Sequence, residues 1–265
     1  MSGANRPLSG ETAVVSGGLG DIGAAVVRAL TDAGAAVAVC DVVPSREGAS
    51  RAAGLVRGGE VVRYDQVDVR DADAVEAWIA DVTSAIGPPT LAVPAAATVT
   101  SARATDITPQ QWSDELRTDV DGAFFVVRAV IDRLLAARRT GHIVFIGSWA
   151  AHRPHPHVPA YSTAKAALRM LCQCLALEYA AAGILVNEVA PGLVNAGLSK
   201  KAFEADEQLR RRSHRAVPLG RMLSPDDVAR EVVHLCTTTT MTGSTVIVDG
   251  GLSLPTPLTA GAGDD

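Results

Sequence analysis

The apolar residues of this chain follow two patterns that alternate from one end to the other. Longer segments have a helical period, and in one of them Val75, Trp78, Ile79 and Val82 fall on a single helix face. Short runs rich in β-branched residues predict strands at Thr12–Val15, Ala36–Cys40, Val61–Tyr64, Leu91–Val93, His142–Ile146, Ile184–Val189 and Thr245–Val248. Because strands that alternate with helices become parallel strands joined by crossover helices, we expect an α/β protein: a doubly wound parallel sheet between two helical layers.

Two helix starts carry a complete capping signal. In Thr108–Gln111 and in Ser224–Asp227, a hydroxyl stands at the N-cap, a proline at the first helical position and a reciprocal acceptor at the third. The sequence therefore predicts that helices begin at these two points.

Length and composition favour one domain. The chain has 265 residues, of which 48% are hydrophobic, enough to bury a large core. We expect a single domain over residues 1–265, with residues 1–9 and 255–265 as flexible tails. The net charge of −5 gives no electrostatic reason to expect nucleic acid or an anionic membrane as partner, so a small molecule is favoured. No apolar run is long enough to span a membrane or to form a signal segment, and we expect a cytoplasmic protein.

The four cysteines, Cys40, Cys172, Cys174 and Cys236, contain no CxxC pair. Free cysteine is among the most buried residue types. The sequence therefore predicts reduced thiols in the core.

Residues 16–23, SGGLGDIG, form a glycine-rich loop between the first predicted strand and the helix that follows it. In this setting the free amides of the helix N-terminus bind a pyrophosphate, as in the Rossmann fold. Gly17 and Gly23 stand at the turn and at the close approach of helix and strand, while Gly18 and Gly20 leave the backbone open to phosphate. The loop predicts a dinucleotide cofactor.

Asp21 occupies a position where such loops usually carry glycine, and two interpretations are open. As a helix N-cap, its carboxylate accepts hydrogen bonds from the amides of the first turn and points away from the phosphates. In the other interpretation it faces the pyrophosphate and repels it.

Asp41 ends the second predicted strand, where a carboxylate accepts hydrogen bonds from both ribose hydroxyls and rejects a 2′-phosphate. No Arg or Lys follows it directly, so the sequence favours NAD over NADP. The alternative is a carboxylate with no role beyond being solvated at a strand end.

Tyr161 and Lys165 lie one helical turn apart in the motif YSTAK, so their side chains project from the same face. A tyrosine phenol is a poor base at neutral pH, but a neighbouring ammonium group favours its phenolate form. Ser148 closes an earlier predicted strand, HIVFIGS, from which its hydroxyl can bind the same substrate oxygen. The three residues together predict proton exchange with a substrate hydroxyl.

With these motifs in this order, the sequence resembles the short-chain dehydrogenase/reductase family from about Leu8 to Leu252. The resemblance also includes Asp68-Val69, which faces the adenine in the family, the APG of Ala190–Gly192 and the closing Thr242–Gly251. It implies an NAD(P)-dependent oxidoreductase that interconverts alcohols and ketones, with Ser148, Tyr161 and Lys165 as catalytic residues. The cofactor-binding positions that it implies are Gly17, Gly20, Asp21, Ile22, Gly23, Asp41, Asp68, Val69, Ala95, Tyr161, Lys165, Pro191, Gly192 and Val194.

The chain departs from the family at four points around this site: Asp21, Pro94–Ala97, Asp119 and Ala196. Pro94–Ala97 replaces NNAG and removes its amide side chains. Asp119 replaces the family's catalytic asparagine; it can accept from a relay water but cannot donate as an amide does. Ala196 replaces a threonine that often touches the carboxamide. The departures are compatible with drifted or specialised catalysis and with a protein that binds the cofactor without turnover.

The substrate is expected to meet the segment Trp149–Ala160, which lies between the catalytic serine and tyrosine. Trp149, Ala150 and His155 are the predicted substrate contacts. Prolines hold the segment extended, so His152, His155 and His157 are not expected to converge on a metal. Residues 193–215 correspond to the family's substrate lid. The pattern is most similar to family members that oxidise sugars, polyols or cyclitols; a 3-oxoacyl or polyketide ketoreductase, which would prefer NADP, is the alternative.

The predicted helices at 110–137 and 160–181 carry apolar residues on more than one face. These residues are Phe124, Phe125, Val130, Leu171 and Leu175. Helices of this kind are buried on two sides, and in the family they pair subunits. We therefore expect a homodimer or homotetramer.

Overall fold

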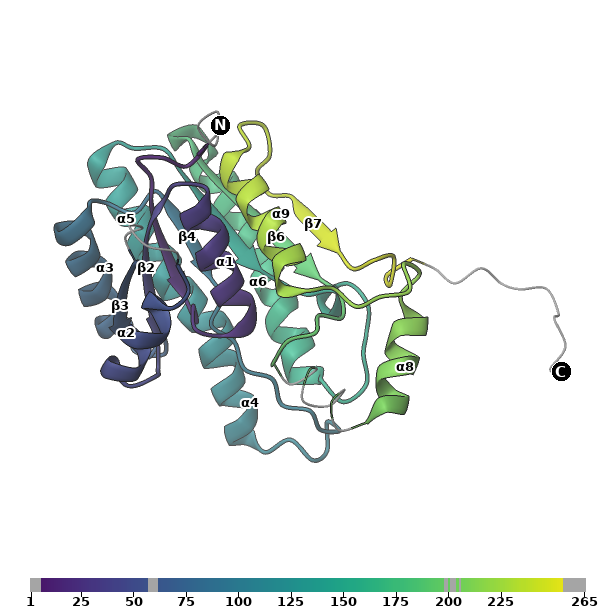
Figure 1. The fold of residues 1–265 in the computed structure, drawn as a ribbon. Helices are drawn as coiled ribbons and strands as arrows, with labels where there is room; N and C mark the ends of the chain where they lie inside the picture. Colours follow the sequence, from purple (N-terminus) through teal and green to yellow (C-terminus); the bar gives the residue numbers. More distant parts are fainter. Residues whose placement is uncertain (1–5, 57–61, 198–199, 201–203, 205, 255–265) are drawn as a thin grey trace, which may run out of the picture.

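The computed structural model describes residues 6–56, 62–197, 200, 204 and 206–254. A seven-stranded sheet with the order β3-β2-β1-β4-β5-β6-β7 forms its centre, and every strand pair is parallel (Figure 1). The strands are β1 (Thr12–Ser16), β2 (Ala36–Asp41), β3 (Val62–Gln66), β4 (Leu91–Pro94), β5 (Gly141–Ile146), β6 (Ile184–Pro191) and β7 (Thr245–Val248). The predicted fold class and all seven predicted strands are confirmed; Val61, the expected first residue of β3, lies outside the described residues.

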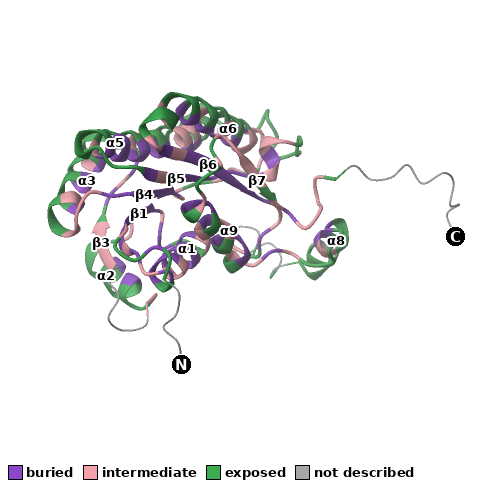
Figure 2. Ribbon diagram, turned by 90° about the horizontal axis from the view of Figure 1, so that it is seen from above, coloured by how far each residue is buried: buried purple, intermediate pink, exposed green. Residues whose placement is uncertain are grey.

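Helices cover both faces of the sheet, as Figure 2 shows from above. The helices are α1 (Asp21–Asp32), α2 (Ser45–Ala53), α3 (Ala72–Ile86), α4 (Pro109–Leu116), α5 (Gly122–Ala137), α6 (Pro159–Tyr179), α8 (Glu207–Ala216) and α9 (Pro225–Thr237), with short turns η1 (Arg117–Asp121), η2 (Trp149–Ala151) and η3 (Ala180–Ala182). One face of the sheet packs against α1, α2 and α9, and the other against α3, α5 and α6. Every helix in the described part of the chain is too short or too polar to span a membrane.

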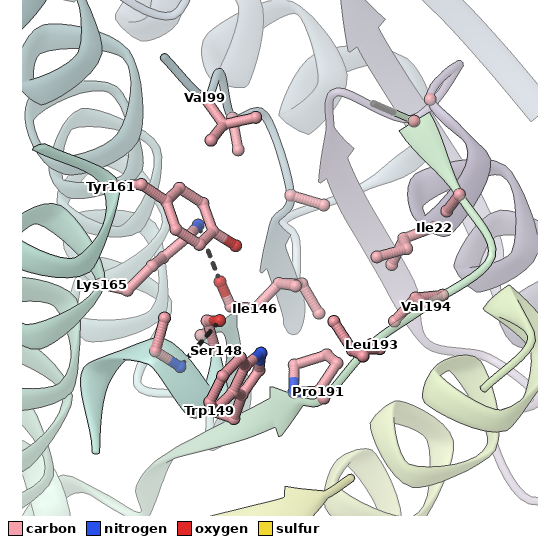
Figure 3. Close-up of a pocket in the computed structure, with 18 of the residues that line it drawn as sticks. Ile22, Val99, Ile146, Ser148, Trp149, Tyr161, Lys165, Pro191, Leu193 and Val194 are labelled. Carbon is pink, nitrogen blue, oxygen red and sulfur yellow. Dashed lines mark hydrogen bonds between the residues drawn. The ribbon is translucent and has the colours of Figure 1, made fainter. Parts of the chain in front are cut away.

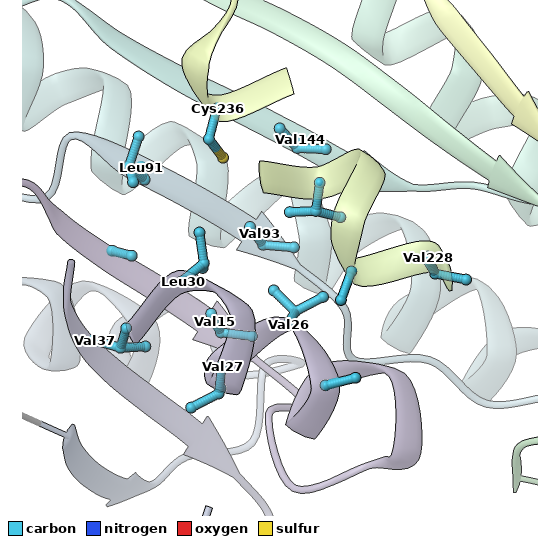
Figure 4. Packing of buried hydrophobic residues seen from close by; sticks show 14 of the residues in the cluster. Val15, Val26, Val27, Leu30, Val37, Leu91, Val93, Val144, Val228 and Cys236 are labelled. Carbon is cyan, nitrogen blue, oxygen red and sulfur yellow. The ribbon is translucent and has the colours of Figure 1, made fainter. Parts of the chain in front are cut away.

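Alternation along the strands builds two cores. In β1, Ala13 and Val15 face the α1–α9 side, shown in Figure 4, while Val14 faces the α3–α6 side. All three are fully buried, which explains why β1 reads as a continuous apolar run. In α3 the buried residues are the predicted four: Val75, Trp78, Ile79 and Val82.

Both predicted capping boxes are present. The Thr108 hydroxyl accepts from the Gln111 amide at 3.2 Å, and the Gln111 side chain accepts from the Thr108 amide at 2.9 Å. Ser224 and Asp227 make the same reciprocal pair at the start of α9. The helix that begins at α4 continues into α5 through the π-helical turn η1. Such turns frequently mark functional sites, and η1 contains Asp119.

Three sequence expectations need correction. Leu8, placed in a flexible tail, is buried in the α1–α9 core, and its amide donates to Ala33 O at 2.9 Å. Cys174 is exposed, whereas Cys40, Cys172 and Cys236 are buried; all four are free thiols.

The third correction concerns the apolar residues cited for subunit pairing. Val130 and Leu175 are buried in this chain's own α3–α6 core, and Phe125 and Leu171 pack against it. Phe124 is exposed, as expected. The other exposed apolar side chains on α5 and α6 are Leu135, Met170 and Leu177.

The order of the strands places a crevice at the carboxyl ends of β1 and β4, where the chain connections run in opposite directions. Gly23 lets α1 approach this edge closely. A Cβ atom at Gly23 would lie 2.2 Å from the carbonyl oxygen of Gly17, far inside van der Waals contact.

We predict that Gly23→Ala lowers the free energy of unfolding by about 1–3 kcal/mol, the usual cost of overpacking, because backbone atoms must move to admit the methyl group. Urea unfolding measures the change. Gly54→Ala is the matched control: Gly54 has a φ of −73° and its nearest neighbour to a Cβ atom is 3.4 Å away, so its stability should stay the same or rise slightly. Equal stability of the two variants would contradict the close approach of α1.

Candidate active site

A cavity of about 710 Å³ opens at the carboxyl ends of the strands. It has the size of a typical small-molecule site. The sequence-predicted residues that line it are Gly20, Asp21, Ile22, Gly23, Ala95, Ser148, Trp149, Ala150, His155, Tyr161, Lys165, Pro191, Gly192 and Val194. Residues from the first helix, the middle of the chain and the segment after β6 thus meet at one place.

The three predicted catalytic side chains lie close together in this cavity (Figure 3). Lys165 is almost fully buried, and its Nζ donates to the carbonyl oxygen of Ile146 at 3.1 Å. The same Nζ lies 5.4 Å from the centre of the Tyr161 ring. Ser148 follows β5, and its Oγ accepts from the Ala150 amide at 3.1 Å. That bond leaves the Ser148 proton free to be donated to a substrate oxygen.

Asp119 lies behind Lys165, outside the cavity wall. It is completely buried: Oδ1 accepts from the Thr98 amide at 2.7 Å, and Oδ2 lies 3.5 Å from Lys165 Nζ. Burial raises the pKa of Asp119, and the Lys165 ammonium group partly offsets the increase. Burial acts to lower the pKa of Lys165, but the charges of Asp119 and Tyr161 raise it overall. The π turn therefore supplies a counterion to the buried lysine.

The proposed N-cap role of Asp21 is wrong. The N-cap of α1 is Gly20, Asp21 is the first helical residue, and no side chain caps the helix. The Asp21 carboxylate instead accepts from the Gly197 amide at 2.7 Å. This hydrogen bond ties the glycine loop to the segment after β6. The helix N-terminus stays open toward the cavity.

Asp41 lies beside the glycine loop rather than in the cavity wall. Its carboxylate accepts from the Leu19 amide at 3.2 Å and from the Val42 amide at 2.8 Å. Arg51 of α2 donates to the carbonyl oxygen of Leu19 at 2.9 Å. The carboxylate is thus held at the carboxyl end of β2 by backbone donors.

Gly17, Asp68 and Val69 are the other predicted cofactor residues outside the cavity wall. The Asp68 carboxylate pairs with Arg70 at 2.6 Å, which lowers the pKa of Asp68. Val69 packs against Gly122, where a Cβ atom would lie 2.5 Å from its side chain. Gly17 has a φ of +64°, and a Cβ atom there would lie 2.5 Å from Ala96 Cα. The small residues that replace NNAG therefore pack directly against the glycine turn.

The end of the cavity away from the glycine loop is lined mainly by apolar groups. Trp149 and His155 meet edge to face, with ring centres 5.4 Å apart. Val99, Val158 and Leu193 also line the cavity. Val158 belongs to the segment expected to meet the substrate and Leu193 to the expected lid, whereas Val99 was not predicted from the sequence. His155 faces the cavity as predicted.

The other two histidines of this segment lie elsewhere. His152 is placed near Arg169, and burial lowers the pKa of His152. His157 has a φ of +67°, which turns the chain before α6. Nowhere among the described residues do three His, Cys, Asp or Glu side chains gather as a metal site requires. Of the expected lid, residues 198–199, 201–203 and 205 lie outside the described residues.

Two buried acidic residues escaped the sequence analysis. Glu188 of β6 is completely buried and accepts from the Thr245 hydroxyl at 2.6 Å. Glu115 of α4 is also completely buried and accepts from the Thr100 amide at 3.0 Å. Burial raises the pKa of both carboxyl groups. Glu115 could have been found from the sequence, because it stands one helical turn before Asp119. Glu188 lies in a predicted strand, and nothing in the neighbouring sequence indicates that it contacts the site.

The residues present fit a dinucleotide. The open N-terminus of α1 faces the cavity, Gly17 and Gly23 allow the backbone to form a narrow cradle, and the Asp41 carboxylate lies beside that cradle.

Comparison with known proteins agrees with this geometry. A family model described as "Enoyl-(Acyl carrier protein) reductase" matches residues 8–253. The chain is 34% identical to galactitol 2-dehydrogenase of Rhizobium johnstonii, covering 93% of this chain and 96% of the relative. It is 31% identical to 3beta-hydroxysteroid dehydrogenase 1 of Eggerthella lenta, covering 93% and 95%. The solved structure of a gluconate 5-dehydrogenase from Burkholderia cenocepacia in complex with NADP and tartrate is 27% identical, with a TM-score of 0.89 and coverage of 95% and 99%.

We predict that Glu188→Gln removes a pH-dependent loss of stability. A raised pKa means that folded Glu188 keeps its proton at pH values where the unfolded chain, with a pKa of about 4.3, has released it. This contribution to stability is fully present below the unfolded pKa and is lost as the pH rises through the folded one. The variant should therefore match the wild type near pH 4 and exceed it at pH 8, by about 1.4 kcal/mol for each unit of pKa difference.

Urea unfolding at a series of pH values measures this difference. Glu178→Gln, at an exposed position on α6, is the matched control and should follow the wild-type pH profile. If Glu188→Gln also follows it, the carboxyl group of Glu188 is ionised in the folded protein and the prediction is wrong.

Proposed function

Because the chain belongs to the short-chain dehydrogenase/reductase family, whose members are oxidoreductases that act on alcohols, we propose that it is an NAD-dependent enzyme that interconverts a secondary alcohol and a ketone. The observation that carries this proposal is the convergence of Ser148, Tyr161 and Lys165 on one cavity beside the glycine loop. Asp21, Asp119 and Ala196 depart from the family pattern, but the three groups that would handle the proton are all present.

The chain's own residues handle the proton. When bound, NAD supplies the hydride acceptor, and NADH supplies the hydride for the reverse reaction. In alcohol oxidation, Tyr161 takes the hydroxyl proton while Ser148 donates a hydrogen bond to the substrate oxygen. The Lys165 ammonium group lies 5.4 Å from the centre of the Tyr161 ring, and the Ile146 carbonyl group holds the lysine in place.

The preference for NAD is supported by Asp41. Its carboxylate stands where a ribose is expected, and the Leu19 and Val42 amides hold it there. A 2′-phosphate at this position would meet a like charge. The related gluconate 5-dehydrogenase structure contains NADP, so the choice has to be tested in this chain.

The cavity supports a neutral substrate, and we propose a sugar, polyol or cyclitol-like compound. Among the described residues that line it, Lys165 is the one lysine or arginine, and its ammonium group is already engaged. An anionic acyl carrier would therefore find no free cation in this wall. Trp149, Val99 and Leu193 suit the C–H face of a ring, and Thr98 and His155 can bind its hydroxyl groups.

We also propose assembly into a homodimer or homotetramer through α5 and α6. Leu177, with 86% of its surface exposed, and Met170, with 59%, lie on α6, and Leu135 and Phe124 lie on α5. Burial of these side chains against a second copy would remove apolar surface from water.

We predict that NAD binds more tightly than NADP, and that Asp41→Ala removes most of the difference. Calorimetric titration of the wild type and the variant with both cofactors measures it. Asp32→Ala, at the exposed end of α1, is the control for a lost surface carboxylate and should keep the preference. Equal or tighter binding of NADP by the wild type would contradict the assignment and favour the 3-oxoacyl or polyketide ketoreductase alternative.

For turnover, we predict that Tyr161→Phe reduces the rate by at least about 100-fold, as expected for a lost general acid or base, whereas Asp119→Asn keeps it within roughly tenfold. The assay follows reduced cofactor with a panel of polyols, cyclitols, alicyclic alcohols and 3-oxoacyl thioesters. Both variants should bind NADH like the wild type, which separates catalysis from binding. Unchanged activity of Tyr161→Phe would overturn the catalytic assignment, and a wild type that binds NAD without converting any substrate would favour a cofactor-binding protein.

A further inference from the structure

The buried lysine of the site has more acidic neighbours than its charge can balance. Asp119 lies 3.5 Å from Lys165 Nζ, and Glu115 and Glu188 are close enough for the lysine charge to affect the pKa of each. Burial raises the pKa of Glu188, and the charge of Arg169 partly offsets that increase. Because the charge of Arg169 can balance that of Glu188, the charge of Lys165 has to balance the two remaining carboxyl groups, Glu115 and Asp119.

Glu115 and Asp119 are placed as a pair. They lie one helical turn apart where α4 passes into the π turn, and both are completely buried. Each accepts one backbone amide from the same segment, Thr98 for Asp119 and Thr100 for Glu115. Among the described residues, the other oxygen of Glu115, Oε1, accepts no hydrogen bond, and the other oxygen of Asp119, Oδ2, faces only the Lys165 ammonium group, 3.5 Å away.

Charge balance decides the state of the pair. Two ionised carboxylates would place two buried negative charges beside one ammonium group, and neighbouring carboxyl groups in one buried site avoid this by retaining a proton. Burial raises the pKa of Glu115, and the charge of Asp119 acts in the same direction. The proton belongs to the pair rather than to either residue.

We propose that Glu115 and Asp119 share one proton and serve Lys165 as its proton acceptor and donor. The proposal rests on the proposed function, in which Lys165 stands next to Tyr161. Glu115 acts through Lys165 and does not itself touch the substrate.

The proton balance works in both directions. After Tyr161 takes the proton of the alcohol, Lys165 gives one proton to the pair, which then holds two, and recovers one from Tyr161. After Tyr161 gives a proton to a ketone, Lys165 reprotonates it and takes the shared proton, which leaves both carboxylates ionised. No electrons move in either sequence, and one exchange with solvent restores the pair.

Infrared spectroscopy tests the shared proton without substrate or cofactor. We expect the wild type at neutral pH to show the carbonyl band of a protonated carboxylic acid that disappears in Glu115→Gln and changes in frequency in Asp119→Asn. Glutamine keeps the oxygen that accepts from the Thr100 amide and cannot hold the proton, so the fold is preserved. Asp114→Asn, a partly exposed neighbour on α4, is the matched control and should leave the band unchanged.

Glu188 is the competing source of such a band. If the band that responds to Asp119→Asn is lost in Glu188→Gln and remains in Glu115→Gln, the proton is held by Glu188 and the proposal is overturned. Absence of any protonated carboxyl band that Glu115→Gln removes overturns it as well. Because neither outcome depends on turnover, both are distinguishable from a failure of the proposed function.

Ketone reduction tests the role of the pair. In the wild type, the rate should fall as the pH rises through the pKa of the pair, since the shared proton is then lost. Glu115→Gln should remove this fall and lower the rate by less than the ~100-fold of a lost general acid, and Glu115→Asp should restore a pH-dependent fall. A Glu115→Gln profile identical to the wild type would show that the pair does not supply the proton.

Discussion

The burial of the Lys165 ammonium group is the constraint on which the rest of this site depends. A buried charge must be compensated, and this one is held by a carbonyl group of β5 and by a carboxylate of the π turn. These two contacts fix the relative positions of α6, the sheet and the α4–α5 helix. They also set the place of Tyr161, one turn before the lysine, at the mouth of the crevice between the strands.

Three of the departures from the family pattern make specific packing or hydrogen-bond contacts in this structure. The small residues after β4 do not leave a gap, because the backbone of Ala96 lies against Gly17. Asp21 does not cap its helix but binds the Gly197 amide, and so joins the glycine loop to the segment after β6. Asp119 accepts from the Thr98 amide and places its other carboxylate oxygen 3.5 Å from Lys165 Nζ. The cavity is present with these residues in place.

The interior of this chain holds more acidic side chains near Lys165 than the charge of that lysine can balance. Glu115, Asp119 and Glu188 come from a helix, a π turn and a strand, and each lies close enough to Lys165 to interact with its charge. Side chains buried in this way are costly unless they are paired or neutral. The site therefore combines the Lys165 ammonium group, which is needed next to Tyr161, with buried carboxyl groups that can gain or lose a proton when the lysine does.

The sequence by itself determined the strands, the parallel sheet, both capping boxes and the residues of the cavity wall that belong to short motifs. Local spacing is sufficient for these, because strand alternation, helix caps and the glycine loop are set by neighbours in the chain. Only the tertiary structure decided the partner of Asp21, the burial of Leu8, the place of Val99 in the cavity wall, and the approach of Glu115 and Glu188 to Lys165. Those contacts join residues far apart in the sequence, and the charge that each buried group can carry depends on what the fold packs against it.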